Sequence, residues 1–139
     1  MIDEIHLALC PLCSLYLETH QHLFLHCQFS WSVWSIILDW WKIKWVCPVS
    51  VPSLARWWFA NGLTRLEKHI WEACFYATLW FLWLVRNDYI FNNSTKQAWE
   101  VGEVVKTRVA MWMKAKFNSK VYTVEEFKVF LDGIRKLRL

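Results

Sequence analysis

The chain has 139 residues, of which 56% are hydrophobic, and it contains 12 tryptophans but only three glycines and three prolines. This length suits one domain with a sizeable core, the apolar content argues against disorder, and the scarcity of turn residues argues against an all-β fold. The formal net charge of +4 is too small to indicate a partner by itself. We therefore expect an all-α fold, a small helical bundle that forms a single domain over residues 1–139.

The first distinctive motif is a cluster of cysteines and histidines that begins with Cys10-Pro-Leu-Cys13. Two residues between cysteines allow both thiolates to face one ion from a tight turn, and soft ligands of this kind suit Zn²⁺. A structural zinc site needs two more ligands. The chain supplies four candidates shortly afterwards, which are His20, His22, His26 and Cys27.

The residues alone leave the ligand set open. His22 and Cys27 complete one tetrahedral set with the cysteine pair. His22 and His26 complete another, because side chains four residues apart share a helix face, and Cys27 is then spare. His20 is a third candidate histidine. In each case the protein supplies every ligand, so the site is expected to be closed and structural.

The chain after this cluster is predicted to be helical in three pieces before residue 64. Residues 19–28 are compatible with a helix that turns His22 toward the cysteines. Ser30 is a candidate N-cap for a helix with an aromatic face that runs to Trp41. Residues 42–53 contain two prolines and are predicted to be an irregular connection, followed by a short helix over residues 53–60 that stops at Asn61-Gly62.

The longest predicted helix starts at the capping box Thr64-Arg-Leu-Glu67. Nearly every residue of 70–85 is apolar, so a membrane span is the alternative. The uncharged run over residues 73–85 falls short of the roughly 18 residues that a span requires. Burial as the central helix of a bundle is therefore expected, with an end at Arg86-Asn87-Asp88.

Two more helices are expected in the C-terminal part. Ser94-Thr-Lys-Gln97 has the form of a capping box and precedes an amphipathic pattern that lasts to Phe117, with a break at Asn118-Ser119. Thr123-Val-Glu-Glu126 precedes a terminal amphipathic helix. Residues 8–41 thus form the predicted metal-binding knuckle and aromatic helix, and residues 64–139 form the predicted bundle with basic C-terminal helices.

The charges are unevenly distributed along the chain. Residues 106–139 hold nine Lys or Arg against three acids, whereas residues 1–105 hold seven against nine. A basic tail of this kind either contacts phosphate or is an ordinary solvated helix face. The weak candidates for RNA or DNA contact are Lys106, Arg108, Lys114, Lys116, Arg135, Lys136 and Arg138.

The tryptophans allow two interpretations. Aromatic faces bind single-stranded bases, but few Lys or Arg alternate with these tryptophans as a base-binding platform requires. Helical spacing favours core positions for Trp31, Trp34, Trp41, Trp71, Trp80, Trp83, Trp99 and Trp112. Aromatic surface beyond what one small core can hold would predict a dimer or a partner interface.

The metal-binding motif and its surroundings resemble a known family. Cys10-Pro-Leu-Cys13, Glu18-Thr19, His22-Leu23-Phe24 and Cys27, followed by Trp34 and Trp41, look like the zinc-binding domain of plant non-LTR (LINE-type) retrotransposon reverse transcriptases. Trp80, Trp83, Arg86-Asn87 and Phe91 are similar to a stretch that often follows it.

The resemblance implies a specific ligand set and role. It nominates Cys10, Cys13, His22 and Cys27 as ligands of a structural Zn²⁺ and leaves His20 and His26 outside the first shell. The chain has no spaced acidic set for two-metal chemistry, so the resemblance implies a detached accessory domain rather than a working polymerase. The place of this domain in the parent element implies contact with RNA or DNA.

Neither a nucleophile pair nor a phosphate loop is evident, so we expect a non-catalytic protein. The acids in the first four residues and the odd cysteine count predict reduced thiols in the cytoplasm or nucleus. Two functions remain as hypotheses: a zinc-binding module that holds RNA or DNA, and a short domesticated or orphan protein that binds a protein partner or forms homo-oligomers through its apolar helices.

Overall fold

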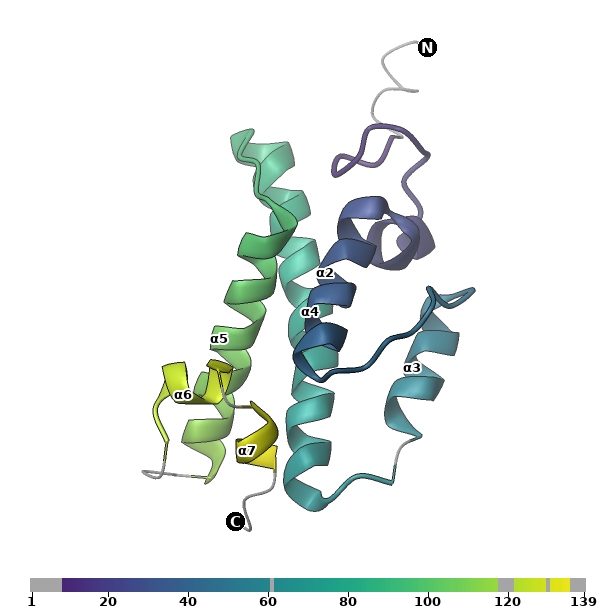
Figure 1. Ribbon diagram of the computed structural model, residues 1–139. Helices are drawn as coiled ribbons and strands as arrows, with labels where there is room; N and C mark the ends of the chain where they lie inside the picture. Colours follow the sequence, from purple (N-terminus) through teal and green to yellow (C-terminus); the bar gives the residue numbers. More distant parts are fainter. Residues whose placement is uncertain (1–8, 61, 118–121, 130, 136–139) are drawn as a thin grey trace, which may run out of the picture.

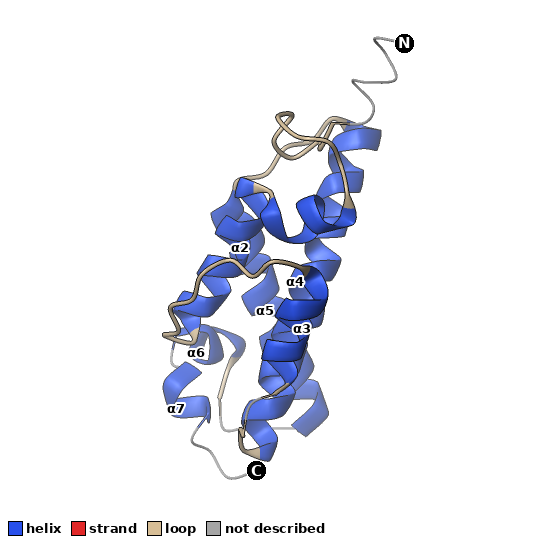
Figure 2. Ribbon diagram, turned by 90° about the vertical axis from the view of Figure 1, so that its right-hand side faces the viewer, coloured by secondary structure: helices blue, strands red, loops and turns tan. Residues whose placement is uncertain are grey.

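The computed structural model describes residues 9–60, 62–117, 122–129 and 131–135 and is all-α over this part of the chain (Figures 1 and 2). Its only β-type pairing among these residues is an isolated bridge between Leu9 and Leu17. The helical elements are η1 (His22–His26, a π-helix), α2 (Gln28–Trp40), α3 (Val51–Phe59), α4 (Arg65–Asn92), α5 (Ala98–Phe117), α6 (Val124–Val129) and α7 (Leu131–Arg135). The predicted fold class is confirmed.

The bundle is organised around the hairpin of α4 and α5, which lie side by side in opposite directions (Figure 1). α2 packs against both of these helices, α3 packs on α4, and α6 contacts the C-terminal part of α5. The loop over residues 9–19 carries the candidate ligands Cys10 and Cys13 and is called the metal-binding loop. This loop and η1 lie at the upper end of the bundle, where η1 contacts both α2 and α4 (Figure 1). No helix in the described part is long and apolar enough to cross a bilayer.

Tryptophans form the centre of the core. Trp58 of α3 and Trp71 of α4 stack with ring centroids 3.9 Å apart. Each indole N–H donates to the other residue's backbone carbonyl at 2.6 Å, so both buried donors are satisfied. Trp34 and Trp41 pack edge-on against this pair, at 5.4 Å from Trp58 and 4.8 Å from Trp71. The predicted core positions of Trp34, Trp41 and Trp71 are confirmed.

The core prediction is wrong for four other tryptophans. Trp80 and Trp83 of α4, and Trp99 and Trp112 of α5, are exposed. Trp31 is half-buried. For Trp80 and Trp83 the reason is that α2, α3 and α5 cover only part of the surface of α4, so its all-round apolar sequence leaves one face uncovered.

The starts of α2 and α3 also differ from the predictions. α2 begins at Gln28 with Cys27 as its N-cap, and the buried Ser30 hydroxyl donates instead to the carbonyl of Leu23. α3 begins within the predicted irregular connection, because Ser50 accepts a hydrogen bond from the Ser53 N–H as its N-cap. Its proline lies in the first turn, where a missing N–H leaves no intrahelical bond unmade.

The predicted start of α4 is confirmed, since Thr64 accepts from the Glu67 N–H. The helix continues past the predicted end to Asn92 and stops at Asn93, which adopts a left-handed φ of 51°. The predicted capping box at Ser94-Thr-Lys-Gln97 is wrong. α5 begins at Ala98. The Gln97 N–H donates to the Glu100 carboxylate, and this is the hydrogen bond that the fourth residue of a capping box makes to the first, here about one turn later than predicted.

The last predicted box is confirmed, because the Glu126 N–H donates to the Thr123 hydroxyl at 3.1 Å. The terminal helix is described as two segments, α6 and α7, on either side of residue 130. The predicted stops at Asn61 and at Asn118-Ser119 lie outside the described residues, as do residues 1–8.

Candidate metal centre

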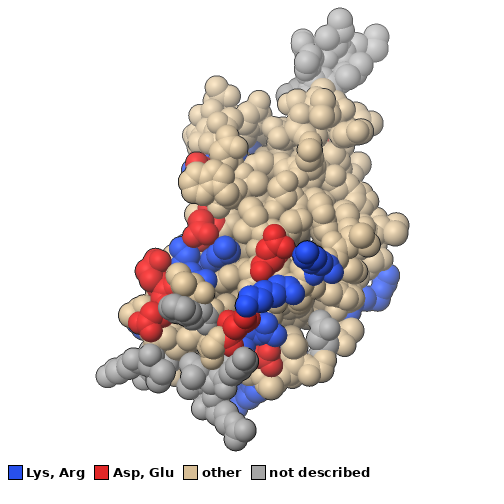
Figure 3. All heavy atoms as spheres, viewed as in Figure 1, with Lys and Arg blue, Asp and Glu red and all other residues tan. Residues whose placement is uncertain are grey.

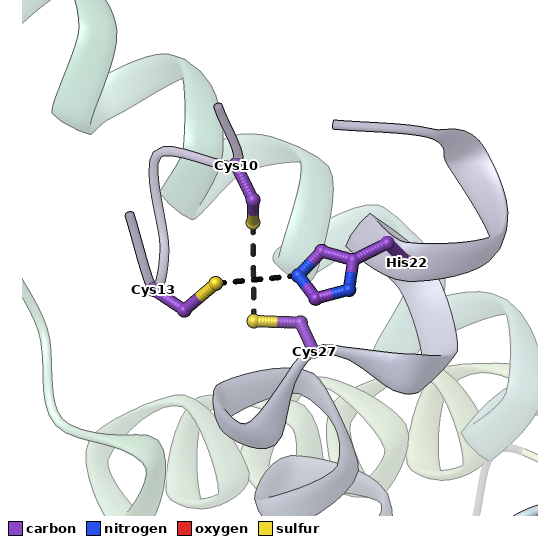
Figure 4. Close-up of side chains that lie close together, drawn as sticks. All are labelled: Cys10, Cys13, His22 and Cys27. Carbon is purple, nitrogen blue, oxygen red and sulfur yellow. Dashed lines mark hydrogen bonds between the residues drawn. The ribbon is translucent and has the colours of Figure 1, made fainter. Parts of the chain in front are cut away.

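Four of the predicted ligands converge on one point (Figure 4). The Sγ atoms of Cys10, Cys13 and Cys27 and a ring nitrogen of His22 all lie within 4.8 Å of one another. Cys13 Sγ is 3.2 Å from His22 Nε2, and Cys10 Sγ is 3.9 Å from Cys27 Sγ. A tetrahedron built on Zn–S distances of about 2.3 Å has edges of about 3.8 Å. The donor set and its spacing therefore fit a Cys₃His zinc site.

The first two ligands are brought together by a tight turn. The Cys10 N–H donates to the Tyr16 carbonyl at 2.8 Å, and the Ser14 N–H donates to the Cys10 carbonyl at 2.7 Å. Ser14 adopts a left-handed φ of 58°, which reverses the chain directly after Cys13. These hydrogen bonds and the chain reversal at Ser14 hold the Cys10 and Cys13 side chains on the same side of the turn (Figure 4).

The other two ligands depend on the π-helix. The Thr19 hydroxyl accepts from the His22 N–H at 3.0 Å and holds the start of the helix. The Cys27 N–H then donates to the His22 carbonyl at 2.7 Å. In an α-helix, side chains five residues apart would point about 140° away from each other. The wider π turn reduces this angle, so His22 and Cys27 face the same ion.

The alternative histidines lie outside the cluster. His26 is exposed, and its Nε2 is 3.1 Å from the carbonyl oxygen of Pro48. His20 is also exposed and lines an apolar groove with Phe24 and Trp80. Neither histidine belongs to the cluster of ligand atoms.

The buried thiols of Cys10 and Cys27 are hydrogen-bonded to each other. The hydrogen bond from Cys10 to Cys27 raises the pKa of Cys10 and lowers that of Cys27, so Cys27 is the more readily deprotonated of the two. Burial opposes the shift at Cys27, but the backbone N–H groups of Ser30 and Phe29 at the start of α2 reinforce it. A thiolate at a helix N-terminus is the form that binds metal.

A partly buried ion pair joins the metal-binding loop to α4. Arg86 Nη2 is 2.5 Å from Glu18 Oε1, and both side chains are only 20% exposed. The Arg86 guanidinium also lies 5.0 Å from the Trp83 ring centroid, and Phe24 of η1 stacks on Trp83 at 6.4 Å. Sequence reasoning missed this pairing. A signal existed, because Glu18 is the only charged residue between positions 5 and 38 and Arg86 is the only Lys or Arg between 69 and 95.

Two of the basic residues predicted to contact RNA or DNA form ion pairs with acidic side chains. Lys106 pairs with Glu103 at 3.3 Å, and Arg135 pairs with Glu67 at 2.9 Å. Figure 3 shows basic and acidic side chains intermingled on the lower half of this face, rather than a surface of one sign.

The other predicted basic residues are dispersed. Arg108 is exposed and lies over the Phe81 ring, and Lys114 and Lys116 are in the last turn of α5. Lys136 and Arg138 lie outside the described residues. The assignment of this set to RNA or DNA stays a prediction.

The fold and the cluster together define a small helical protein with a candidate Cys₃His metal site. Comparisons with protein-family models, with curated proteins and with solved structures gave no match.

Proposed function

We propose that this chain is a non-catalytic zinc-binding module in which Cys10, Cys13, His22 and Cys27 hold a structural Zn²⁺. The observation that carries the proposal is the convergence of these four ligand atoms within 4.8 Å. Four protein ligands fill a tetrahedral shell and leave no position for a reactive water. The metal would tie the metal-binding loop to the start of α2, and its binding free energy would add to folding.

The test is the metal content of protein purified without added metal, measured by elemental analysis. We expect one zinc per chain in the wild type, and loss of zinc in Cys10→Ser/Cys13→Ser and in His22→Gln. Two matched controls, Cys47→Ser and His26→Gln, change a thiol and an imidazole outside the cluster and should retain the metal. A folded wild-type chain without zinc would contradict the proposal, and loss of zinc in His26→Gln rather than His22→Gln would assign the other ligand set.

We further propose that the module is of the retrotransposon reverse transcriptase type. The resemblance of the two motif stretches supports this origin. The two stretches also meet in space, because Glu18 pairs with Arg86 and Phe24 stacks on Trp83 across more than fifty residues of sequence, so they belong to one structural unit.

A module of this origin would be expected to contact RNA or DNA. Binding of a single-stranded oligonucleotide, followed by fluorescence anisotropy, should weaken steeply as salt rises, since phosphate contacts release counterions. Lys114→Gln/Lys116→Gln should weaken binding and reduce the salt slope by up to about 2. No measurable binding at low salt would contradict this part of the proposal and leave the zinc site unaffected.

A second candidate function is protein association through the apolar helices. The observation that favours it is the exposed aromatic face of α4, because aromatic side chains are enriched at interfaces and are costly to leave in water.

A further inference from the structure

One face of α4 carries a stripe of exposed large apolar side chains. At 100° per residue, their positions fall within an arc of about 120°. This apolar stripe consists of Tyr76, Trp80, Trp83, Leu84, Ile90 and Phe91. Asn87 lies near the middle of the same arc and is the polar residue within it.

The stripe is large enough to matter energetically. Its side chains are 38–78% exposed, and with about 200 Å² for a full side chain they present roughly 600 Å² of surface. This is at the upper end of the patches that monomers leave exposed. A stable interface needs about 800 Å² from each partner, so the stripe and its flanks supply most of that area.

The flanks of the stripe are hollow and apolar. On one side, Phe81, Val85, Val101 and Val104 line a cavity of about 420 Å³ between α4 and α5. On the other side, a cavity of about 470 Å³ lies between α4 and the residues Phe24 and Val51. The same helix therefore provides a ridge and the grooves beside it, which is what a self-complementary surface requires.

We propose that the apolar stripe binds a second copy of this chain, with the two α4 helices antiparallel about a two-fold axis near Trp83 and Leu84. Antiparallel packing places Tyr76 of each copy opposite Phe91 of the other. It also places Trp80 opposite Asn87, whose side-chain amide offers an acceptor to the indole N–H.

The charge at one end of the stripe favours the antiparallel direction. Glu72 lies one turn before Tyr76, at the edge of the same arc. A parallel pair would bring Glu72 against Glu72, whereas the antiparallel pair keeps these two carboxylates at opposite ends of the interface. The inference rests on the second candidate function and does not depend on the metal.

The first test is the molar mass of the wild-type chain by sedimentation equilibrium over about 1–100 µM. We expect reversible dimerisation. Trp80→Glu should weaken it at least 30-fold, which corresponds to about 2 kcal/mol for a buried interface aromatic. Val46→Glu, at a position 78% exposed outside the stripe, is the matched control and should dimerise as the wild type does. Far-ultraviolet circular dichroism verifies that each variant is folded.

The second test addresses the direction of packing. Glu72→Gln should leave the dimer within about twofold of the wild type, because the two Glu72 carboxylates are far apart in an antiparallel pair. In a parallel pair the same change would remove a repulsion between like charges and strengthen the dimer.

Four outcomes would overturn the proposal in whole or in part. If the chain is a monomer at all concentrations, the stripe does not bind a second copy. The second candidate function, association with a different protein, is not contradicted by that result. A dimer insensitive to Trp80→Glu excludes the stripe as the interface. Binding of a monomer to neutral lipid vesicles, abolished by Trp80→Glu, assigns the face to a membrane surface instead. Strengthening of the dimer by Glu72→Gln, the result expected of a parallel pair, excludes the antiparallel arrangement.

Discussion

Glu18 and Arg86 are the residues that connect the metal-binding loop to the bundle. They are distant in sequence, neither has another residue of its own charge sign within nine positions in the chain, and they meet at 2.5 Å with 20% of each side chain exposed. Removing one member of such a pair leaves the other charge partly desolvated, which costs more than the pair itself contributes.

Glu18→Gln should therefore lower the free energy of unfolding by about 1–2 kcal/mol, less than the 3–5 of a fully buried pair because water still reaches both groups. Urea denaturation provides the measurement. Lys42→Gln is the control, since its partner Asp132 is 40% and Lys42 itself 75% exposed, and a change of less than about 0.5 kcal/mol is expected. Equal losses in both variants would show that burial does not distinguish the pairs.

At the scale of elements, the close approach of α2 and α5 depends on Gly102. A Cβ atom added there would lie 2.6 Å from Ile36 Cγ2, and the branched Ile36 side chain has little freedom to withdraw. Gly102→Ala should destabilise the protein by about 1–2 kcal/mol, because overpacking outweighs the gain of about 1 kcal/mol in helix propensity.

Gly133 of α7 is the matched control, because a Cβ there meets nothing within 4 Å. Gly133→Ala should be neutral or stabilising by up to about 1 kcal/mol. Thermal unfolding of both variants provides the comparison. If Gly102→Ala were as stable as the wild type, α2 would have to move away from α5 at no cost, contrary to the close packing of these two helices.

Glu103 joins α5 to α6 and makes stability depend on pH. The hydrogen bond from Lys128 at 2.9 Å and the charge of Lys106 outweigh burial and lower the pKa of Glu103. A carboxyl whose pKa is lower in the folded state stabilises the protein above its unfolded pKa of about 4.5. That contribution is lost as the pH falls below 4.5 through the lower folded value.

We therefore expect the difference in unfolding free energy between wild type and Glu103→Gln to shrink between about pH 5 and pH 3. At neutral pH it should be at most about 1 kcal/mol, because the Glu103 side chain is 46% exposed. Taking the difference between the two proteins cancels the effect of acid on the candidate metal ligands, which both share. A difference that grows toward low pH would contradict a lowered pKa of Glu103 in the folded protein.

At the scale of the whole molecule, the metal-binding part has its own small core. Cys10, Leu23 and Cys27 form a buried cluster separate from the main core, which is built on α2, α3, α4 and α5. The loop before η1 has few other backbone bonds, so its order should depend on the metal.

Removal of zinc with a chelator should thus abolish amide protection over residues 9–27 while α4 and α5 keep theirs. Hydrogen exchange read by mass spectrometry measures both regions in one experiment. A matched treatment of His22→Gln, which is expected to lack the metal, should change nothing further. Loss of protection throughout the chain on chelation would show that the two cores fold as one unit.

Several features followed from sequence because their causes are local. The capping residues Thr64 and Thr123 act within one turn, and the spacing of Cys10 and Cys13 defines a metal-binding turn by itself. These predictions needed only residue types at fixed separations. The start of α3 at Val51 was not predicted, because two prolines in a short segment usually indicate a connection. Here Ser50 caps the helix, so that one proline lies in the first turn, where it is tolerated.

The choice among His20, His22 and His26 could not be made from periodicity, because η1 is a π-helix and its turn differs from the α-helical period. Likewise, the tryptophan pattern of α4 is the same whether a neighbouring helix covers a given face or not. Composition and spacing thus determined that the chain is helical, that it is apolar enough for a core, and that thiols and imidazoles gather near its N-terminus. The tertiary structure decided which four ligands meet, that Glu18 reaches Arg86, and that the apolar stripe of α4 faces outward, because contacts between distant segments depend on how helices pack in space.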